Sequence, residues 1–141
     1  MSEREEQCGK DPFTGTWVYR PERSKSTGPK QERWVQWIEA TADGLRLREE
    51  VVVATGQRTN VSIEAKFDGR DYPVTRSSLS DTIAYTRKGR RKIIGTGKKN
   101  GGVTLRETIA VAGDDETLTL TFGIFEGGRQ VMGFAVFDRV E

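Results

Sequence analysis

The sequence predicts an all-β protein whose strands form a closed antiparallel up-and-down β-barrel of eight to ten strands. Three observations predict this fold. Apolar and polar residues alternate in segment after segment, which is the pattern of a strand with one buried face. Glycine-containing turns separate these segments at short intervals, and no window of comparable length shows a helical stripe. A meander this long closes on itself, because closure removes its exposed edges.

The first four strands are expected between residues 15 and 67. They lie at 15–20, 32–41, 45–54 and 58–67. In the second strand, Trp34 and Trp37 fall on opposite faces, and we expect Trp37 to point inward together with Val35 and Glu39. In the third and fourth strands, nearly every second residue is Leu, Val, Ile, Ala or Phe. Asp43-Gly44 and Thr55-Gly56 supply the turns before and after the third strand.

Five further strands are expected in the second half of the chain. They lie at 81–88, 91–98, 103–112, 117–125 and 129–140, and a Gly-containing turn separates each from the next. Two connections are longer than a hairpin turn, at 21–31 and 69–80. Long loops at the mouth of a barrel often cover its cavity, so both are candidate lids; the alternative is two solvated surface loops.

Length and composition bound the function. The 141 residues fit one domain, which we place at 11–141, after a flexible N-terminal segment at 1–10 that contains the single cysteine. The chain has no His, which excludes Ser-His-Asp catalysis, His-ligated haem and ordinary His zinc sites. We expect neither a metal nor an organic cofactor. The net charge of +2 argues against a nucleic-acid partner.

The sequence also bears on location. No stretch approaches 18 consecutive apolar residues, so we expect no membrane span. The first ten residues lack the apolar core of a signal peptide, and a cytoplasmic location is therefore expected.

Motifs at both ends of the chain resemble the calycin superfamily, which contains the lipocalins and the fatty-acid-binding proteins. Gly15-Thr16-Trp17 opens the first strand, and Arg139 lies in the last. In that superfamily a Gly-x-Trp motif starts the barrel, and an Arg of the final strand packs on the Trp at the closed end. The chain is also similar to small bacterial lipocalin-like proteins of unassigned function in its segments 11–17, 21–25, 67–74 and 137–140.

The chain departs from these families where they bind ligands. It lacks the Thr-Asp-Tyr-like motif and the disulfide common in lipocalins. Fatty-acid-binding proteins hold a carboxylate with an Arg-x-Tyr pair late in the chain, whereas the residue two after Arg139 is Glu141. The resemblance therefore implies a lipocalin-like barrel and leaves the ligand and any activity open.

Two carboxylates interrupt the apolar faces of their strands. Glu49 lies between Leu47 and Val51, and Glu107 lies between Leu105 and Ile109. If these faces line the barrel, both carboxylates point inward, where burial raises the pKa of a carboxyl. Such a group can act as a general acid or base near neutral pH. The alternative is that each is paired with an Arg or with water at a polar end of the barrel.

Two leading hypotheses for function follow. The first is that the barrel cavity binds a small, mostly apolar molecule, with ligand contacts from Trp37, Val51, Ile63, Tyr85, Phe122 and Phe137. The second is a cofactor-independent enzyme of isomerase, cyclase or lyase type, with Glu49 or Glu107 as the catalytic proton-transfer group. A third hypothesis is an interaction protein that uses the basic run at 87–92, although a solvated hairpin is the favoured explanation of that run.

Overall fold

The computed structural model describes residues 11–28 and 31–140, so the N-terminal segment expected at 1–10 lies outside the described residues. One turn of 3-10 helix, η1 (Pro21–Arg23), follows the first strand. The strands are β1 (Gly15–Tyr19), β2 (Lys25–Ser26), β3 (Arg33–Ala40), β4 (Gly44–Val52), β5 (Arg58–Lys66), β6 (Asp68–Thr75), β7 (Thr82–Arg87), β8 (Lys92–Lys99), β9 (Gly102–Val111), β10 (Thr117–Glu126) and β11 (Arg129–Arg139).

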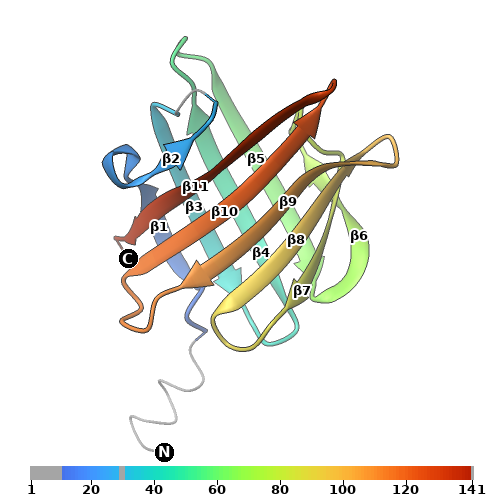
Figure 1. Ribbon diagram of the computed structural model, residues 1–141. Helices are drawn as coiled ribbons and strands as arrows, with labels where there is room; N and C mark the ends of the chain where they lie inside the picture. Colours follow the sequence, from blue (N-terminus) through green and yellow to red (C-terminus); the bar gives the residue numbers. More distant parts are fainter. Residues whose placement is uncertain (1–10, 29–30, 141) are drawn as a thin grey trace, which may run out of the picture.

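The strands form a closed antiparallel barrel (Figure 1). From β3 to β11, each strand is hydrogen-bonded to its neighbours in the chain, and a β1–β11 pairing closes the ring. Within the described residues the sheet has 11 strands, and without the two-residue β2 ten of them make up the ring. The predicted barrel of eight to ten strands is confirmed.

The ring is closed by the longest strand, β11, which meets the beginning of the chain at two places. Its last residues pair with β1, where Trp17 lies opposite Arg139. Its middle pairs with β2, where Ser26 lies opposite Gly133. Between these pairings η1 begins at Pro21, which has no N–H to donate to a strand partner. The first strand of the barrel is therefore split into β1 and β2.

The prediction of an irregular connection over 69–80 is wrong for most of its length, because Asp68–Thr75 forms β6. This strand pairs with β5 at only two positions, Ser62↔Thr75 and Ile63↔Val74, and most of its side chains are exposed. A strand with little buried surface has no need of apolar alternation. Its sequence, which contains Pro73, therefore resembles a loop.

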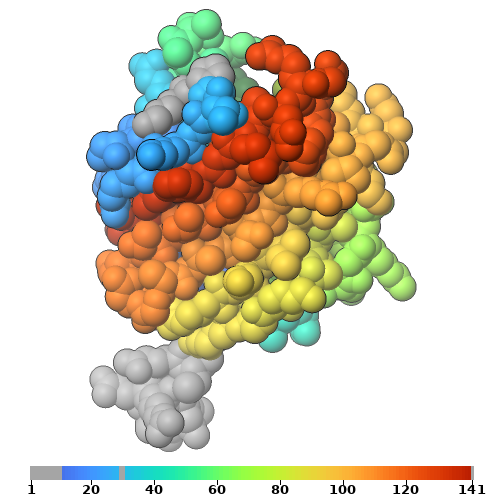
Figure 2. Space-filling view, viewed as in Figure 1, coloured from blue at the N-terminus to red at the C-terminus, as the bar shows by residue number. Residues whose placement is uncertain are grey.

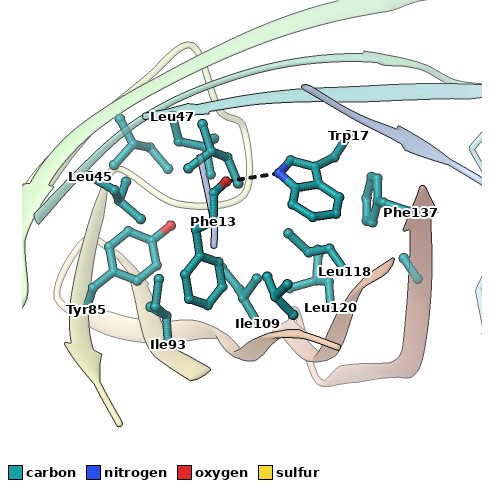
Figure 3. Packing of buried hydrophobic residues seen from close by; sticks show 14 of the residues in the cluster. Phe13, Trp17, Leu45, Leu47, Tyr85, Ile93, Ile109, Leu118, Leu120 and Phe137 are labelled. Carbon is teal, nitrogen blue, oxygen red and sulfur yellow. Dashed lines mark hydrogen bonds between the residues drawn. The ribbon is translucent and has the colours of Figure 1, made fainter. Parts of the chain in front are cut away.

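One end of the barrel is filled by a dense apolar core. Phe13 and Trp17 are fully buried there among side chains from the surrounding strands, and the Trp17 indole N–H donates to the Phe13 carbonyl at 3.0 Å (Figure 3). The Arg139 guanidinium carbon lies 4.3 Å from the centroid of the Trp17 ring. The predicted contact between Trp17 and Arg139 is confirmed. This end is closed by the segment that precedes β1.

The basic run at 87–92 contributes to the same closed end. Arg87 donates to the Asp11 carboxylate at 2.6 Å, and its guanidinium carbon lies 5.1 Å from the Phe13 ring centroid. The Arg87 side chain is only 11% exposed. Arg91 forms an ion pair with Asp115 in the β9–β10 turn. These two cations therefore stabilise the closed end of the barrel.

The opposite end of the barrel is hollowed. In Figure 2 the surface opens between the β4–β5 turn (green) and the β10–β11 turn (red).

The described residues contain no helix long and apolar enough to cross a bilayer.

Candidate functional site

A cavity of about 450 Å³ occupies the barrel interior between the apolar core and the opposite, open end. Its volume is within the usual range for small-molecule sites. Most of the lining is apolar, and β4, β5, β9 and β10 contribute Leu47, Val61, Ile63, Leu105, Leu120 and Phe122 to it. Both long connections also contribute to the lining, with Ser26, Gly28 and Gln31 from the first and Ser77, Ser78, Leu79 and Ser80 from the second.

Glu49 projects into this cavity from β4, as its place among apolar neighbours predicted. Its carboxylate Oε1 accepts two hydrogen bonds from β3, from Trp34 Nε1 at 2.9 Å and from Gln36 Nε2 at 2.9 Å. Burial raises the pKa of Glu49, and the two hydrogen bonds partly oppose this shift because they stabilise the anion. The carboxylate is thus held in place by neutral donors, and among the described residues it has no cationic partner.

Glu107 projects into the cavity from β9, and the pKa of its carboxyl is also raised. Burial raises the pKa of Glu107 to about 8, and the charge of Glu49 contributes to the rise. A hydrogen bond from the Tyr85 hydroxyl acts in the opposite direction. Burial and both carboxylates also raise the pKa of Tyr85 far above its ordinary value, so this phenol remains a donor.

A glycine makes the Tyr85–Glu107 contact possible. Gly95 lies on β8 between the two strands and is the direct partner of both Tyr85 and Glu107. A Cβ at position 95 would lie 2.8 Å from the Tyr85 ring and 3.1 Å from Glu107 Cγ. The missing side chain leaves the space in which these two larger side chains meet.

Gln36 adds an unsatisfied acceptor to the same region. Its side chain lines the cavity and is only 4% exposed, and its Nε2 is used by Glu49. Within the described residues, Gln36 Oε1 has no hydrogen-bond partner. A buried amide oxygen without a donor is costly, so this atom is available to a ligand or to water.

Four of the six predicted ligand contacts line the cavity: Val51, Ile63, Tyr85 and Phe122. Phe137 does not line it. This ring is fully buried in the core and packs edge-on against Trp34, with their centroids 5.0 Å apart. Phe137 therefore packs in the core against Trp34, which itself lines the cavity.

The prediction that Trp37 points inward is wrong. Directly paired residues of neighbouring strands share a face, and inward-facing Trp17 is paired with Gln36. Trp34 and Gln36 therefore face the cavity, while Trp37 lies on the outer wall under Arg48, whose guanidinium carbon is 5.2 Å from its centroid. Glu39 shares the outward face of Trp37 and is exposed. Because Gln36 is polar although it faces inward, the inward face of this strand lacks the apolar alternation on which the prediction depended.

The described part of the chain contains no group of three or more His, Cys, Asp or Glu residues that could hold a metal ion. The cavity therefore offers carboxylates, a phenol, an amide, an indole N–H and serine hydroxyls as its polar groups. This set can bind polar atoms of a ligand or exchange a proton with it.

Comparisons with known proteins relate the chain to others through its fold alone. No protein-family model matches it, and no curated protein does. Among solved structures, the zebrafish ileal bile acid-binding protein complexed with cholic acid matches with a TM-score of 0.58 at 10% sequence identity, covering 92% of this chain and 100% of that chain. The protein has a calycin-type fold. The calycin-type barrel implied by Gly15-Thr16-Trp17 and Arg139 is confirmed. At 10% sequence identity, the likeness to the bile acid-binding protein shows the fold alone and not a shared ligand or activity.

Proposed function

We propose that this protein binds a small, mostly apolar molecule inside the barrel cavity. The observation that carries the proposal is the cavity of about 450 Å³ with its largely aliphatic lining at the end opposite the Phe13–Trp17 core. Burial of apolar ligand surface contributes about 25 cal/mol per Å², so a molecule that fills such a space gains several kcal/mol toward association. The bile acid-binding protein with the same fold was solved with cholic acid, which supports small-molecule binding in general.

Binding of Nile red, an uncharged apolar dye whose emission rises in apolar surroundings, tests this proposal. We expect saturable binding by the wild-type protein. The variant Val51→Trp places a bulky ring in the cavity wall and should weaken binding by about tenfold or more. Its control is Val52→Trp, the next residue on β4, which is not part of the lining and should change the affinity by no more than about twofold.

Two results would overturn this proposal. One is the absence of saturable Nile red binding by the folded wild-type protein. The other is equal binding by Val51→Trp and Val52→Trp, which would place the dye outside the cavity.

A cofactor-independent enzyme is the second candidate. The pKa of Glu107, which is raised to about 8 in its site beside Tyr85, favours this candidate. A carboxyl that exchanges its proton near neutral pH in an apolar cavity can act as a general acid or base in isomerase, cyclase or lyase chemistry. Glu107 would carry the proton, and Glu49 is the alternative acid or base.

A small probe reaction tests the proton-transfer capacity of the cavity. The carboxylate of Glu107 would remove the ring C–H proton of 5-nitrobenzisoxazole, the ring N–O bond would break, and the product would be 2-cyano-4-nitrophenolate, which absorbs visible light. We expect Glu107→Gln or Glu49→Gln to lower this rate by about a hundredfold. Rates that stay unchanged in both folded variants would remove both carboxylates as the acid or base.

A further inference from the structure

The hydrogen-bond donors and acceptors around Glu49 and Glu107 differ in how far they are already engaged within the protein. Beside the two carboxylates, the neighbouring donors already act within the protein: Trp34 Nε1 and Gln36 Nε2 both donate to Glu49, and the Tyr85 hydroxyl donates to Glu107. The serine hydroxyls of the lining come instead from the two long connections. The acceptors keep spare capacity, because each carboxylate can accept several hydrogen bonds and Gln36 Oε1 has accepted none within the described residues. A ligand that donates hydrogen bonds therefore fits this wall better than one that accepts them.

The charge of the cavity points in the same direction. Glu49 and Glu107 are its two acidic residues, and no Lys or Arg is among the described residues that line it. Arginines near these strands are engaged on the outer wall, where Arg33 and Arg58 pair with Glu50. An anionic ligand group inside the barrel would have no counter-ion and would face two carboxyls, which is costly in a low-dielectric interior.

We propose that the cavity selects apolar molecules that carry a protonated primary amine, with the ammonium group held between Glu49, Glu107 and Gln36 Oε1. This inference rests on the proposed ligand-binding function and names its ligand class. A primary ammonium has three N–H donors for the three acceptor groups, and its hydrogen bonds to carboxylates are charge-assisted. An alcohol offers one donor and no charge.

A cation between the two carboxyls also removes the electrostatic conflict between them. The negative charge of Glu49 raises the pKa of Glu107, which favours the protonated form of Glu107 in the empty site. An ammonium group stabilises both carboxylates together, so binding and ionisation of Glu107 support each other. The apolar lining from Leu120 and Phe122 then accommodates the rest of the molecule.

A series with one chain length and three head groups tests the inference. Decylamine, decanol and decanoate are titrated into the wild-type protein at pH 7.5, with displacement of Nile red and calorimetry as readouts. We expect decylamine to bind about tenfold tighter than decanol or more, and decanoate to bind more weakly than decanol. Decanoate binding as tightly as decylamine, or decanol equal to decylamine, would overturn the amine preference.

The two proposals can fail separately in this series. If Nile red and decanol bind but decylamine has no advantage, the ligand-binding function stands and the amine preference falls. If none of the probes binds to the folded protein, the ligand-binding function itself falls and the amine preference falls with it.

Variants then identify the groups that hold the ammonium. Glu49→Gln and Glu107→Gln should each weaken decylamine binding by about tenfold while changing decanol binding by no more than about threefold. Glu50→Gln is the matched control, because Glu50 is adjacent to Glu49 but pairs with arginines on the outer wall. Equal losses for amine and alcohol would assign both Glu residues a structural role and overturn the inference. If either variant does not fold, the wild-type series alone decides.

Discussion

Arg139 lies over Trp17 across the seam that closes the barrel, with its guanidinium carbon 4.3 Å from the indole centroid. The two residues are direct partners in the β1–β11 pairing. The guanidinium also donates to three backbone carbonyls, of Pro12, Thr14 and Asp115, each at 2.6 Å. One side chain thus ties together the segment before β1, the last strand and the β9–β10 turn.

Replacement of Arg139 should therefore destabilise the protein. In Arg139→Ala three carbonyls lose their donor and the Trp17 ring loses its cation, for which we expect a loss of about 3 kcal/mol in the free energy of unfolding. Urea denaturation measures it. Arg46→Ala is the control, since Arg46 is 64% exposed in its ion pair with Glu64 and should cost less than about 1 kcal/mol. A loss at Arg139 no larger than the loss at Arg46 would contradict this role.

Glu107 should make stability depend on pH in a direction opposite to that of a salt-bridged carboxylate. Its pKa of about 8 in the folded protein lies above the ordinary value of 4.5, so the folded state binds the proton more tightly than the unfolded chain. The stabilising effect is complete below the unfolded pKa and is lost as pH rises through 8. The largest slope for one group is about 1.4 kcal/mol per pH unit.

Urea unfolding of wild type and Glu107→Gln at pH 5, 6, 7 and 8 measures this linkage. We expect the wild type to lose at least about 2 kcal/mol relative to the variant between pH 5 and pH 8. Parallel pH profiles for the two proteins would show that Glu107 does not retain its proton in the folded state.

Gly95 should not tolerate a methyl group. The Cβ of Gly95→Ala would lie 2.8 Å from the Tyr85 ring, which is buried and cannot move freely, so we expect a loss of about 1–3 kcal/mol in the free energy of unfolding. Gly113→Ala is the matched control, because the added Cβ at that position meets nothing within 4 Å. Thermal unfolding compares the two variants, and equal stabilities would mean that the Tyr85–Glu107 contact adapts without strain.

Trp34 and Trp37 should respond differently to a ligand. They lie three residues apart on β3, with Trp34 in the cavity wall and Trp37 stacked under Arg48 on the outside. Decanol, which does not absorb in the tryptophan range, should change the tryptophan emission of the wild type and of Trp37→Phe. The change should be largely lost in Trp34→Phe. A response that disappears only in Trp37→Phe would place the ligand on the outer wall.

The alternation of apolar residues was sufficient to predict the barrel and much of its inner face. It placed Glu49 and Glu107 among inward neighbours, because a period of two assigns a face to every residue of a regular strand. It failed where the inner or outer face carries an atypical residue. Because Gln36 on the inward face of β3 is polar, alternation assigned the wrong face of this strand to the interior. Most side chains of β6 are exposed, so this strand shows no apolar alternation.

The arrangement of the polar groups in the cavity was decided by tertiary structure. Glu49 meets Gln36 because the β3–β4 register makes them direct partners, and Tyr85 meets Glu107 across Gly95 because two further registers bring β7, β8 and β9 into line. A shift of one residue in any of these pairings would send one partner to the outer wall. Alternation within a strand determines which face a residue occupies, whereas the registers between strands, set by the turns and by packing of the whole core, determine which residues meet.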